Sequence, residues 1–164
     1  MDASEAVTAR LRLLRQRAVE AAPRAALAAM AHTAVAMVQL ELTKTGSHPK
    51  GAQAAPAPAP PSVVSGSLRR SIIATPPVPL GAGRFSSSVG PTIVYGRIQE
   101  FGGLILPVHA RMLHWKDAGG GDHFAKSVTL PARPYLRTSM QRYLASGVPG
   151  EVATKAFVAA LTAP

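Results

Sequence analysis

The segment LILPVHARMLHWKDAGGGDHFAKSVTL, residues 104–130, decides the fold class of this chain of 164 residues. Two apolar runs, Leu104–Trp115 and His123–Leu130, stand on either side of Gly119-Gly120-Gly121-Asp122. A glycine-rich turn between two such runs is typical of a β-hairpin. We therefore predict a long antiparallel hairpin over residues 104–130.

Helical patterns precede and follow this hairpin. Residues 3–44 repeat apolar side chains at helical spacing, with Ser4 placed to cap the first turn. Pro23 is expected to kink this helix, because proline has no N–H to donate. Further helices are predicted over Tyr135–Ala145 and Glu151–Leu161. The helical stripe that we expect to face the core consists of Leu27, Met30, Ala34, Val38 and Leu42.

Short elements fill the part before the hairpin. A strand is predicted from Ser71 to Ala74, ended by prolines 76, 77 and 79, with a returning strand over residues 85–90. Residues 93–101 fit a short helix that Gly102-Gly103 ends. The order of helices, strands and helices predicts an α+β fold: a long N-terminal helix, a small antiparallel sheet with the long hairpin, and C-terminal helices.

The chain divides into four predicted segments. Residues 45–66 contain alternating Ala-Pro, which favours an extended polyproline conformation and indicates an arm or loop. The segments are a helical segment 1–44, this arm or loop 45–66, an α+β core 67–145 with hairpin 104–130, and a helical tail 146–164.

Composition and charge point to a partner. Thirty residues are Ala and only 5% are aromatic, so a lone copy buries little apolar area, and a partner surface is expected to complete the fold. The net charge is +10, of which residues 45–164 carry +8. This excess indicates either nucleic acid or an acidic protein neighbour. Aromatic residues interleave with cations, a pattern that we interpret as a protein–protein surface in preference to a nucleic-acid platform.

Catalytic and metal chemistry finds little support in the sequence. Without cysteine there is no disulfide, iron–sulfur cluster or thiol nucleophile. His109 and His114 lie five residues apart on a predicted strand and so face opposite sides, and no carboxylate cluster accompanies His123. There is no Gly-x-Ser-x-Gly elbow, phosphate loop or paired-carboxylate spacing. We predict no catalytic, metal or cofactor-binding residue, no cofactor and no enzymatic activity.

No targeting segment is predicted. The start, residues 1–5, is acidic where a secretory signal is basic. The longest apolar helical stretch, Ala25–Leu40, is mostly alanine, and we expect it to be too short and too weakly apolar to span a bilayer. The sequence thus predicts a soluble protein with no membrane partner.

Three segments resemble, in order, the neck and tail-completion proteins of tailed bacteriophages, a tail-component family that includes Mu-type virion morphogenesis proteins. Residues 65–72, SGSLRRSI, are similar to the family's Gly-x-Leu-Arg-x-Ser-Ile motif. Val89-Gly90-Pro91 followed by 94–102, VYGRIQEFG, is similar to a strand and a Tyr-Ala-x-x-x-Glu-x-Gly turn. Residues 128–136, VTLPARPYL, are similar to Pro-Ala-Arg-Pro-Phe-Leu. The resemblance covers residues 42–145, and Gly96 and Tyr135 depart from the family's Ala and Phe.

The resemblance implies roles for the motif residues. Gly66 permits a tight turn, and Leu68 and Ile72 pack under the N-terminal helix. Glu100 caps a helix or pairs with Arg69, Arg70 or Arg133. The residues carried over as structural or interface positions are Gly66, Leu68, Arg69, Arg70, Ser71, Ile72, Tyr95, Glu100, Phe101, Gly102, Pro131, Arg133, Pro134 and Tyr135.

The resemblance also implies a function. It is that of a virion structural protein at the head–tail joint, assembled in the host cytoplasm as a six-fold homo-oligomeric ring. Its neighbours are head-completion or adaptor proteins and tail-terminator or tail-tube proteins, and double-stranded DNA passes through its lumen without sequence-specific contacts. The alternatives are a tail terminator that caps the tail tube and, in a different class, a basic nucleic-acid-binding protein.

Overall fold

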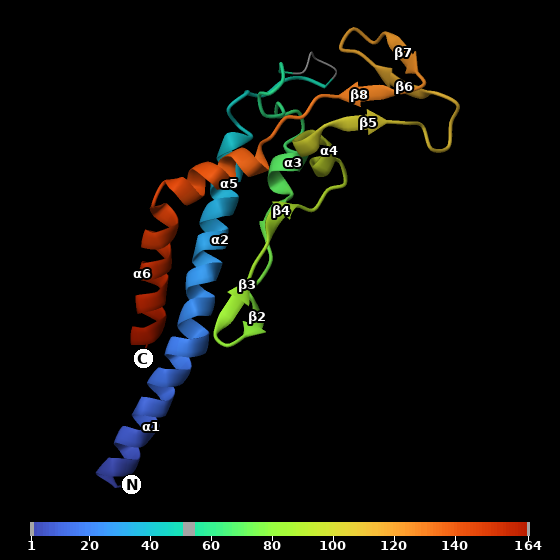
Figure 1. Cartoon of the computed structure of the whole chain (residues 1–164). Helices are drawn as coiled ribbons and strands as arrows, with labels where there is room; N and C mark the ends of the chain where they lie inside the picture. The colour runs from blue at the N-terminus through green and yellow to red at the C-terminus, as the bar shows by residue number, and fades with distance from the viewer. Residues whose placement is uncertain (1, 51–54, 164) are drawn as a thin grey trace. The chain divides into compact units, whose positions relative to one another are not determined.

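The computed structural model describes residues 2–50 and 55–163. A continuous helical segment lies at the N-terminal end of these residues. It consists of α1 (Ala3–Gln16), a π-helical turn η1 (Arg17–Ala21) and α2 (Ala22–Glu41) (Figure 1). Asp2, and not the predicted Ser4, caps α1: its side chain accepts a hydrogen bond from the Glu5 N–H, and its own N–H donates to Glu5 Oε2 at 3.2 Å.

The irregularity predicted at Pro23 is the π-helical turn that precedes it. The Ala22 N–H donates to the Arg17 carbonyl, five residues back. A π turn is a common site of irregularity in a long helix, and here it lies next to the proline that cannot donate. The chain therefore passes through Pro23 without leaving the helix, which ends at Glu41, three residues before the predicted end.

By length and composition alone, the helix Ser4–Glu41 is long and apolar enough to cross a membrane, although only 28% of its most apolar window is buried. The expectation that the apolar stretch is too short was therefore wrong, because the helix is continuous over 38 residues. The core helix of a soluble protein passes the same test, so this observation carries no assignment.

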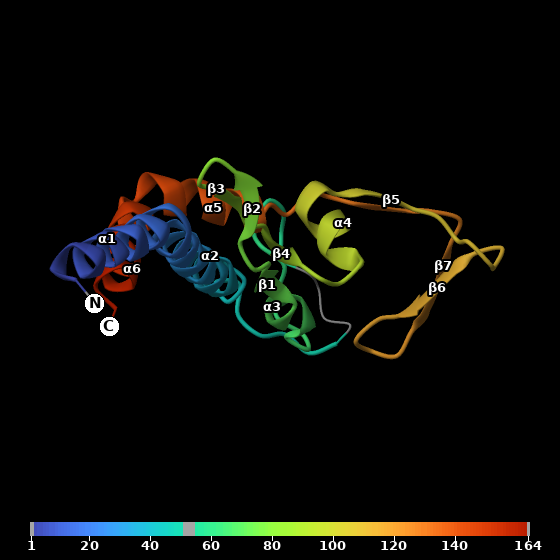
Figure 2. The ribbon, with the colours of Figure 1, turned by 90° about the horizontal axis from the view of Figure 1, so that it is seen from below.

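The chain forms two compact units. Unit 1 comprises residues 1–34, 74–89 and 143–164. Its helix α6 (Val148–Thr162) packs against η1 (Figures 1 and 2). Tyr143 is 2% exposed, and its hydroxyl donates to the Met30 carbonyl at 3.0 Å. Helix α6 begins at Val148, before the predicted Glu151, because Pro149 is tolerated in a first helical turn.

A two-stranded hairpin of β2 (Val78–Gly81) and β3 (Arg84–Ser86) also belongs to unit 1. The strand β1 ends at Ala74, before prolines 76, 77 and 79, as predicted. The separate strand β2 is not predicted by the sequence, and Pro79 lies within it, opposite Phe85. A strand in a two-stranded pair has one unpaired edge, where a missing N–H costs nothing.

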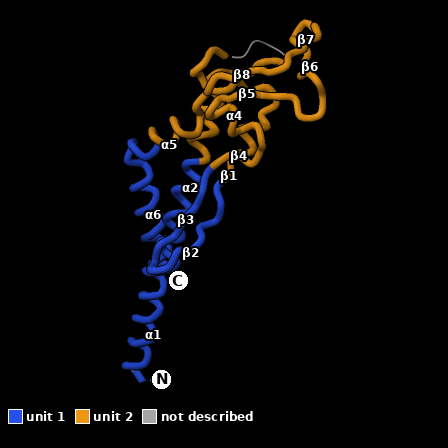
Figure 3. Tube along the Cα trace, turned by 45° about the vertical axis from the view of Figure 1, so that its right-hand side comes forward, with its two compact units in different colours: residues 1–34, 74–89, 143–164 blue, residues 35–73, 90–142 orange. Residues whose placement is uncertain are grey.

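Unit 2 comprises residues 35–73 and 90–142 (Figure 3). It contains the end of α2, α3 (Ser67–Arg70) and α4 (Tyr95–Phe101), and most of α5 (Leu136–Ala145). The strands β1 (Ile72–Ala74) and β4 (Val89–Pro91) pair with each other. The buried side chains of this unit include Val38, Leu42, Ile72 and Tyr135. The expected core stripe is confirmed for Ala34, Val38 and Leu42, which are buried, whereas Leu27 and Met30 are half-buried.

The predicted long hairpin is present as two separate ladders, and the small sheet as four two-stranded sheets. The strands β5 (Gly103–Ile105) and β8 (Val128–Leu130) form one ladder, and β6 (Leu113–Lys116) and β7 (Asp122–Ala125) the other. Residues 106–112 on one side face only residues 126–127 on the other, so no single register continues through both ladders. Pro107 lies in the longer side and has no N–H to donate to a ladder.

The described ends of the predicted arm or loop, residues 45–66, are hydrogen-bonded to each other. The His48 N–H donates to the Val63 carbonyl at 2.9 Å, and the Val63 N–H donates to the Gly46 carbonyl at 3.0 Å. These bonds hold both ends of the predicted segment 45–66 together, while its residues 51–54 lie outside the described part of the chain. The architecture is α+β, as predicted.

Candidate interaction site around Glu100

A buried carboxylate organises the motif residues of unit 2. Glu100 lies on α4 and is 4% exposed. Its Oε2 accepts hydrogen bonds from the N–H groups of Tyr135 and Leu136, both at 2.8 Å, and its Oε1 accepts one from Arg137 at 3.0 Å. These are N–H groups at the start of α5, which have no partner within their own helix. Glu100 therefore caps α5 from a distance of 35 residues in sequence, with its charge at the positive end of the helix.

The structure distinguishes between the two roles weighed for Glu100, a helix cap and an ion pair with an arginine. Its partners are backbone N–H groups, and it forms no ion pair with Arg69, Arg70 or Arg133 in the described chain. The Arg133 backbone N–H instead donates to the Gln99 carbonyl at 2.9 Å. Of the two roles weighed for Glu100, a cap or a pair with an arginine, the cap is the one observed, and three N–H donors engage the carboxylate.

Tyr135 is fully buried beside this cap. Its hydroxyl donates to the Gly96 carbonyl at 3.1 Å, and the Ser139 hydroxyl donates to the Tyr135 carbonyl at 2.6 Å. Burial, together with the negative charge of Glu100 and the nearby Tyr95, raises the pKa of Tyr135 to about 12. Tyr135 thus stays neutral at physiological pH and acts as a packing and hydrogen-bonding residue.

Gly96 and Tyr135, the two residues that depart from the resembled motifs, are in contact with each other. A Cβ at Gly96 would lie 3.2 Å from the Tyr135 hydroxyl oxygen and 2.5 Å from Pro91 Cγ. The larger tyrosine and the smaller glycine therefore fit together. Gly102, where α4 ends, has a φ of +68°, and a Cβ there would lie 2.7 Å from the Ala132 nitrogen. It is thus fixed as glycine by both conformation and space.

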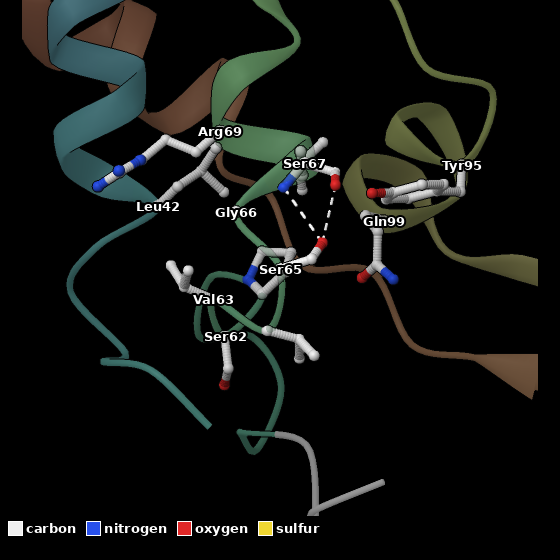
Figure 4. Close-up of a pocket in the computed structure, with 12 residues that line it drawn as sticks. Leu42, Ser62, Val63, Ser65, Gly66, Ser67, Arg69, Tyr95 and Gln99 are labelled. Carbon is white, nitrogen blue, oxygen red and sulfur yellow. Dashed lines mark hydrogen bonds between the residues drawn. The ribbon is translucent and has the colours of Figure 1, made fainter. Parts of the chain in front are cut away.

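The first motif segment lies against the end of α2. Gly66 has a φ of +72° and precedes α3, as the predicted tight turn requires. Ile72 is 2% exposed, and Gln39 of α2 donates to its carbonyl at 3.5 Å. Leu68 is among the residues that line a hollow of about 170 Å³. Figure 4 shows Leu42, Gly66 and Tyr95 at the same hollow.

The remaining predicted positions are divided between the interior and the surface. Ser71 is buried, and its hydroxyl donates to the Leu68 carbonyl at 2.7 Å. Tyr95 and Phe101 are 45% and 64% exposed. Arg69, Arg70 and Pro131 are exposed, and Arg133 and Pro134 are half-buried. The motif residues therefore form a shared frame, and only some of them are available to a partner.

One ion-pair cluster, around Glu41, has no signal in the sequence. Glu41, 5% exposed at the end of α2, is bound by Arg142 and, at 2.6 Å, by Lys44. Burial favours a raised pKa for Glu41, but the hydrogen bonds and charges of Lys44 and Arg142 outweigh it, and the pKa is lowered. Because 101 residues separate Glu41 from Arg142, no spacing pattern could have revealed the pair.

Unit 2 holds most of the net charge. Its residues include 11 cations and four carboxylates, a balance of +7 from the whole chain's +10. All four carboxylates are engaged: Glu41 by two cations, Glu100 by the α5 backbone, and Asp117 and Asp122 by histidines at 2.9 and 2.6 Å. Among the described residues of unit 2, the cations without an acidic partner are Lys50, Arg69, Arg70, Arg97, Arg111, Lys126, Arg133 and Arg137.

In the β6–β7 hairpin, each of the two histidines stacks on an aromatic ring of the facing strand. His114 stacks on Phe124, with ring centroids 4.7 Å apart, and His123 stacks on Trp115 at 5.5 Å. Hydrogen bonds from His123 and from the Gly121 and Gly119 N–H groups lower the pKa of Asp117. Within the described ranges, no three His or carboxylate side chains converge as metal ligands.

Comparison of the chain with protein-family models, with curated proteins and with solved structures finds no match. Function is therefore argued from the residues and their geometry.

Proposed function

We propose that this protein is a structural subunit of the neck of a tailed bacteriophage. It forms a homo-oligomeric ring, six-fold by the resemblance, that joins the portal complex of the head to the tail and lets DNA pass. Its partners are the adjoining head-completion or adaptor protein and a tail-terminator or tail-tube protein. It carries no catalytic residue and no cofactor, and its place is in the virion.

One observation carries this proposal: the three segments that resemble the phage family assemble into one unit. The Thr92 N–H donates to the Ser71 carbonyl at 3.0 Å, which joins the first segment to the loop within the second. The Glu100 cap and the bond from Arg133 to Gln99 join the second segment to the third. Residues that are scattered in sequence but support one another in space are what a shared local fold requires.

The charge of unit 2 supports the passage of DNA. Eight cations without acidic partners give an attraction to phosphates that does not depend on base sequence. A lumen for DNA needs this kind of contact. The same observation favours the second candidate, a nucleic-acid-binding protein that acts as a monomer.

Electron microscopy and DNA binding separate the two candidates. Purified full-length protein is imaged in negative stain without DNA, and its binding to a random-sequence duplex is titrated at several salt concentrations. Closed rings with a central hole, and weak binding by any monomer fraction, support the neck assignment. Monomers that bind the duplex tightly and lose affinity steeply with salt contradict it and favour the nucleic-acid-binding protein.

A further inference from the structure

One face of α4, in unit 2, is not covered by the rest of the described chain. Val94, Arg97 and Phe101 follow one another at helical spacing, so they share this face. Val94 is 97% exposed, Phe101 is 64% exposed, and Arg97 is exposed between them. No described carboxylate pairs with Arg97. An arginine beside an aromatic side chain is typical of the residues that dominate a protein interface.

A hollow of about 250 Å³ adjoins this face. Arg97 and Phe101 line it, together with Pro91 and Leu136 of the same unit. An aliphatic side chain can enter it beside the guanidinium and fill space that is otherwise left without packing contacts. The surface on α4 therefore fits a partner that offers a carboxylate between apolar side chains.

Helix α6, in unit 1, carries a carboxylate in this setting. Val148, Glu151 and Val158 recur at helical spacing on α6. Val148 and Val158 are 37% and 50% exposed, and Glu151 is exposed. No cation of the described chain forms an ion pair with Glu151. The exposed side of α6 thus matches α4 in shape and is opposite to it in charge.

Few other carboxylates of the chain are available to Arg97. Those of unit 2 are engaged, and the first two of unit 1 form the capping box of α1. Glu20 lies between Arg17 and Arg24, three residues before it and four after it, and no exposed apolar side chain occupies those spacings. Glu151, which has an exposed valine three residues before it, is the carboxylate that fits the α4 face.

We propose that the α4 face of one copy docks on the exposed side of α6 of the next copy, with Arg97 paired to Glu151. Val94 and Phe101 then lie against the two exposed valines of α6. The contact joins two different surfaces, so it repeats head to tail, as a ring does. It rests on the homo-oligomeric ring of the proposed function and names the surfaces between its subunits. The other cations of unit 2 remain available to DNA.

An exchange of charges tests this pair. Full-length Arg97→Glu and Glu151→Arg proteins are weighed by light scattering at several concentrations without DNA. Each variant alone should need about tenfold more protein for half assembly, because like charges then face each other between copies. An equimolar mixture of the two should assemble like the wild type, because each copy meets an opposite charge on both neighbours. The double variant should do the same.

The matched controls are Arg111→Glu and Glu20→Arg, which make the same charge changes at exposed positions outside the contact. Both should assemble like the wild type. Circular dichroism checks the fold, and a variant that loses its helical signal is replaced by the corresponding glutamine variant, which removes the pair without repulsion.

The outcomes separate this contact from the neck assignment. Unchanged assembly of both single variants, or a loss that the mixture does not repair, overturns the contact, while a wild-type ring leaves the neck assignment standing. A wild-type monomer at every concentration overturns the ring and the contact together.

Discussion

Glu100 is the residue on which the frame of unit 2 most depends. Replacement by alanine leaves three N–H groups at the start of α5 without their acceptor, that of Tyr135 buried and those of Leu136 and Arg137 part-buried. We expect Glu100→Ala to lower the free energy of unfolding by about 3 kcal/mol, as loss of hydrogen bonds to a buried charged group does. Urea unfolding, followed by circular dichroism, measures this change.

The matched control is Glu151→Ala, which removes an exposed carboxylate from the first turn of α6. It should cost less than about 1 kcal/mol. Glu100→Gln should fall between the two, because its single amide oxygen still accepts hydrogen bonds. Equal losses for Glu100→Ala and Glu151→Ala would show that Glu100 is not a cap that the fold relies on.

Gly96 and Tyr135 give a second prediction at the residue scale. Gly96→Ala crowds both Pro91 and the Tyr135 hydroxyl, and Tyr135→Phe removes that hydroxyl. In a double-mutant cycle, the clash with Pro91 cancels because both backgrounds contain it. We expect Gly96→Ala to cost about 1 kcal/mol less when residue 135 is Phe. Additive costs in urea unfolding would contradict a direct coupling.

At the scale of elements, Trp115 makes the β6–β7 hairpin observable, since it is the only tryptophan. The pKa of Asp117 is lowered in the folded hairpin, so its hydrogen bonds stabilise the turn above its ordinary pKa near 4 and are lost as pH falls through the lowered value. Acidification below about pH 4 should therefore release His123 from Asp117 and change Trp115 fluorescence.

Asp117→Asn should abolish this acid transition, because an amide does not titrate. Asp122→Asn, which affects the His114–Phe124 pair, is the control and should retain it. Circular dichroism must stay constant over the same range, so that the signal reports the hairpin alone. An unchanged transition in Asp117→Asn would assign the signal to another group.

Some boundaries of helices and strands could be predicted from sequence patterns alone, and others could not. Gly102 ended α4 as predicted, because a glycine with positive φ is a local requirement that the sequence states directly. Prolines 76, 77 and 79 mark the end of β1, but they hide the short strand β2 that contains Pro79. Pro149 does not break the helix, because it lies in the first turn of α6, where no N–H is needed. The break between the two hairpin ladders depends on unequal lengths of the two sides, which apolar runs do not encode.

The candidate site was predictable only in part. The motif order drew attention to Glu100 and Tyr135, and one of the two roles weighed for Glu100 is the one observed. The pairing of Glu41 with Arg142 arises from a contact between segments that are distant in sequence. Val7 and Leu11 of α1 are 60% and 61% exposed, although they recur with the same periodicity as the core stripe, so periodicity alone could not distinguish an exposed stripe from a buried one.

At the scale of the whole molecule, the proposed passage of DNA predicts a role for the cations of unit 2 that have no acidic partner among the described residues. Arg69→Gln with Arg70→Gln should reduce the slope of log affinity against log salt concentration by about 1.8 for duplex DNA, the loss of two phosphate contacts. Arg10→Gln with Arg12→Gln, two cations of unit 1, is the control and should leave the slope nearly unchanged. Fluorescence anisotropy at several salt concentrations measures both slopes. Equal slopes in the two variants would contradict contact through Arg69 and Arg70.

Native mass spectrometry of the full-length protein tests the central claim, assembly into a closed ring, most directly. A closed ring gives one discrete mass, because a ring of repeated head-to-tail contacts has a fixed copy number. We predict a single hexameric species that persists on dilution. A monomer at every concentration, or an unbounded series of masses, would contradict the account.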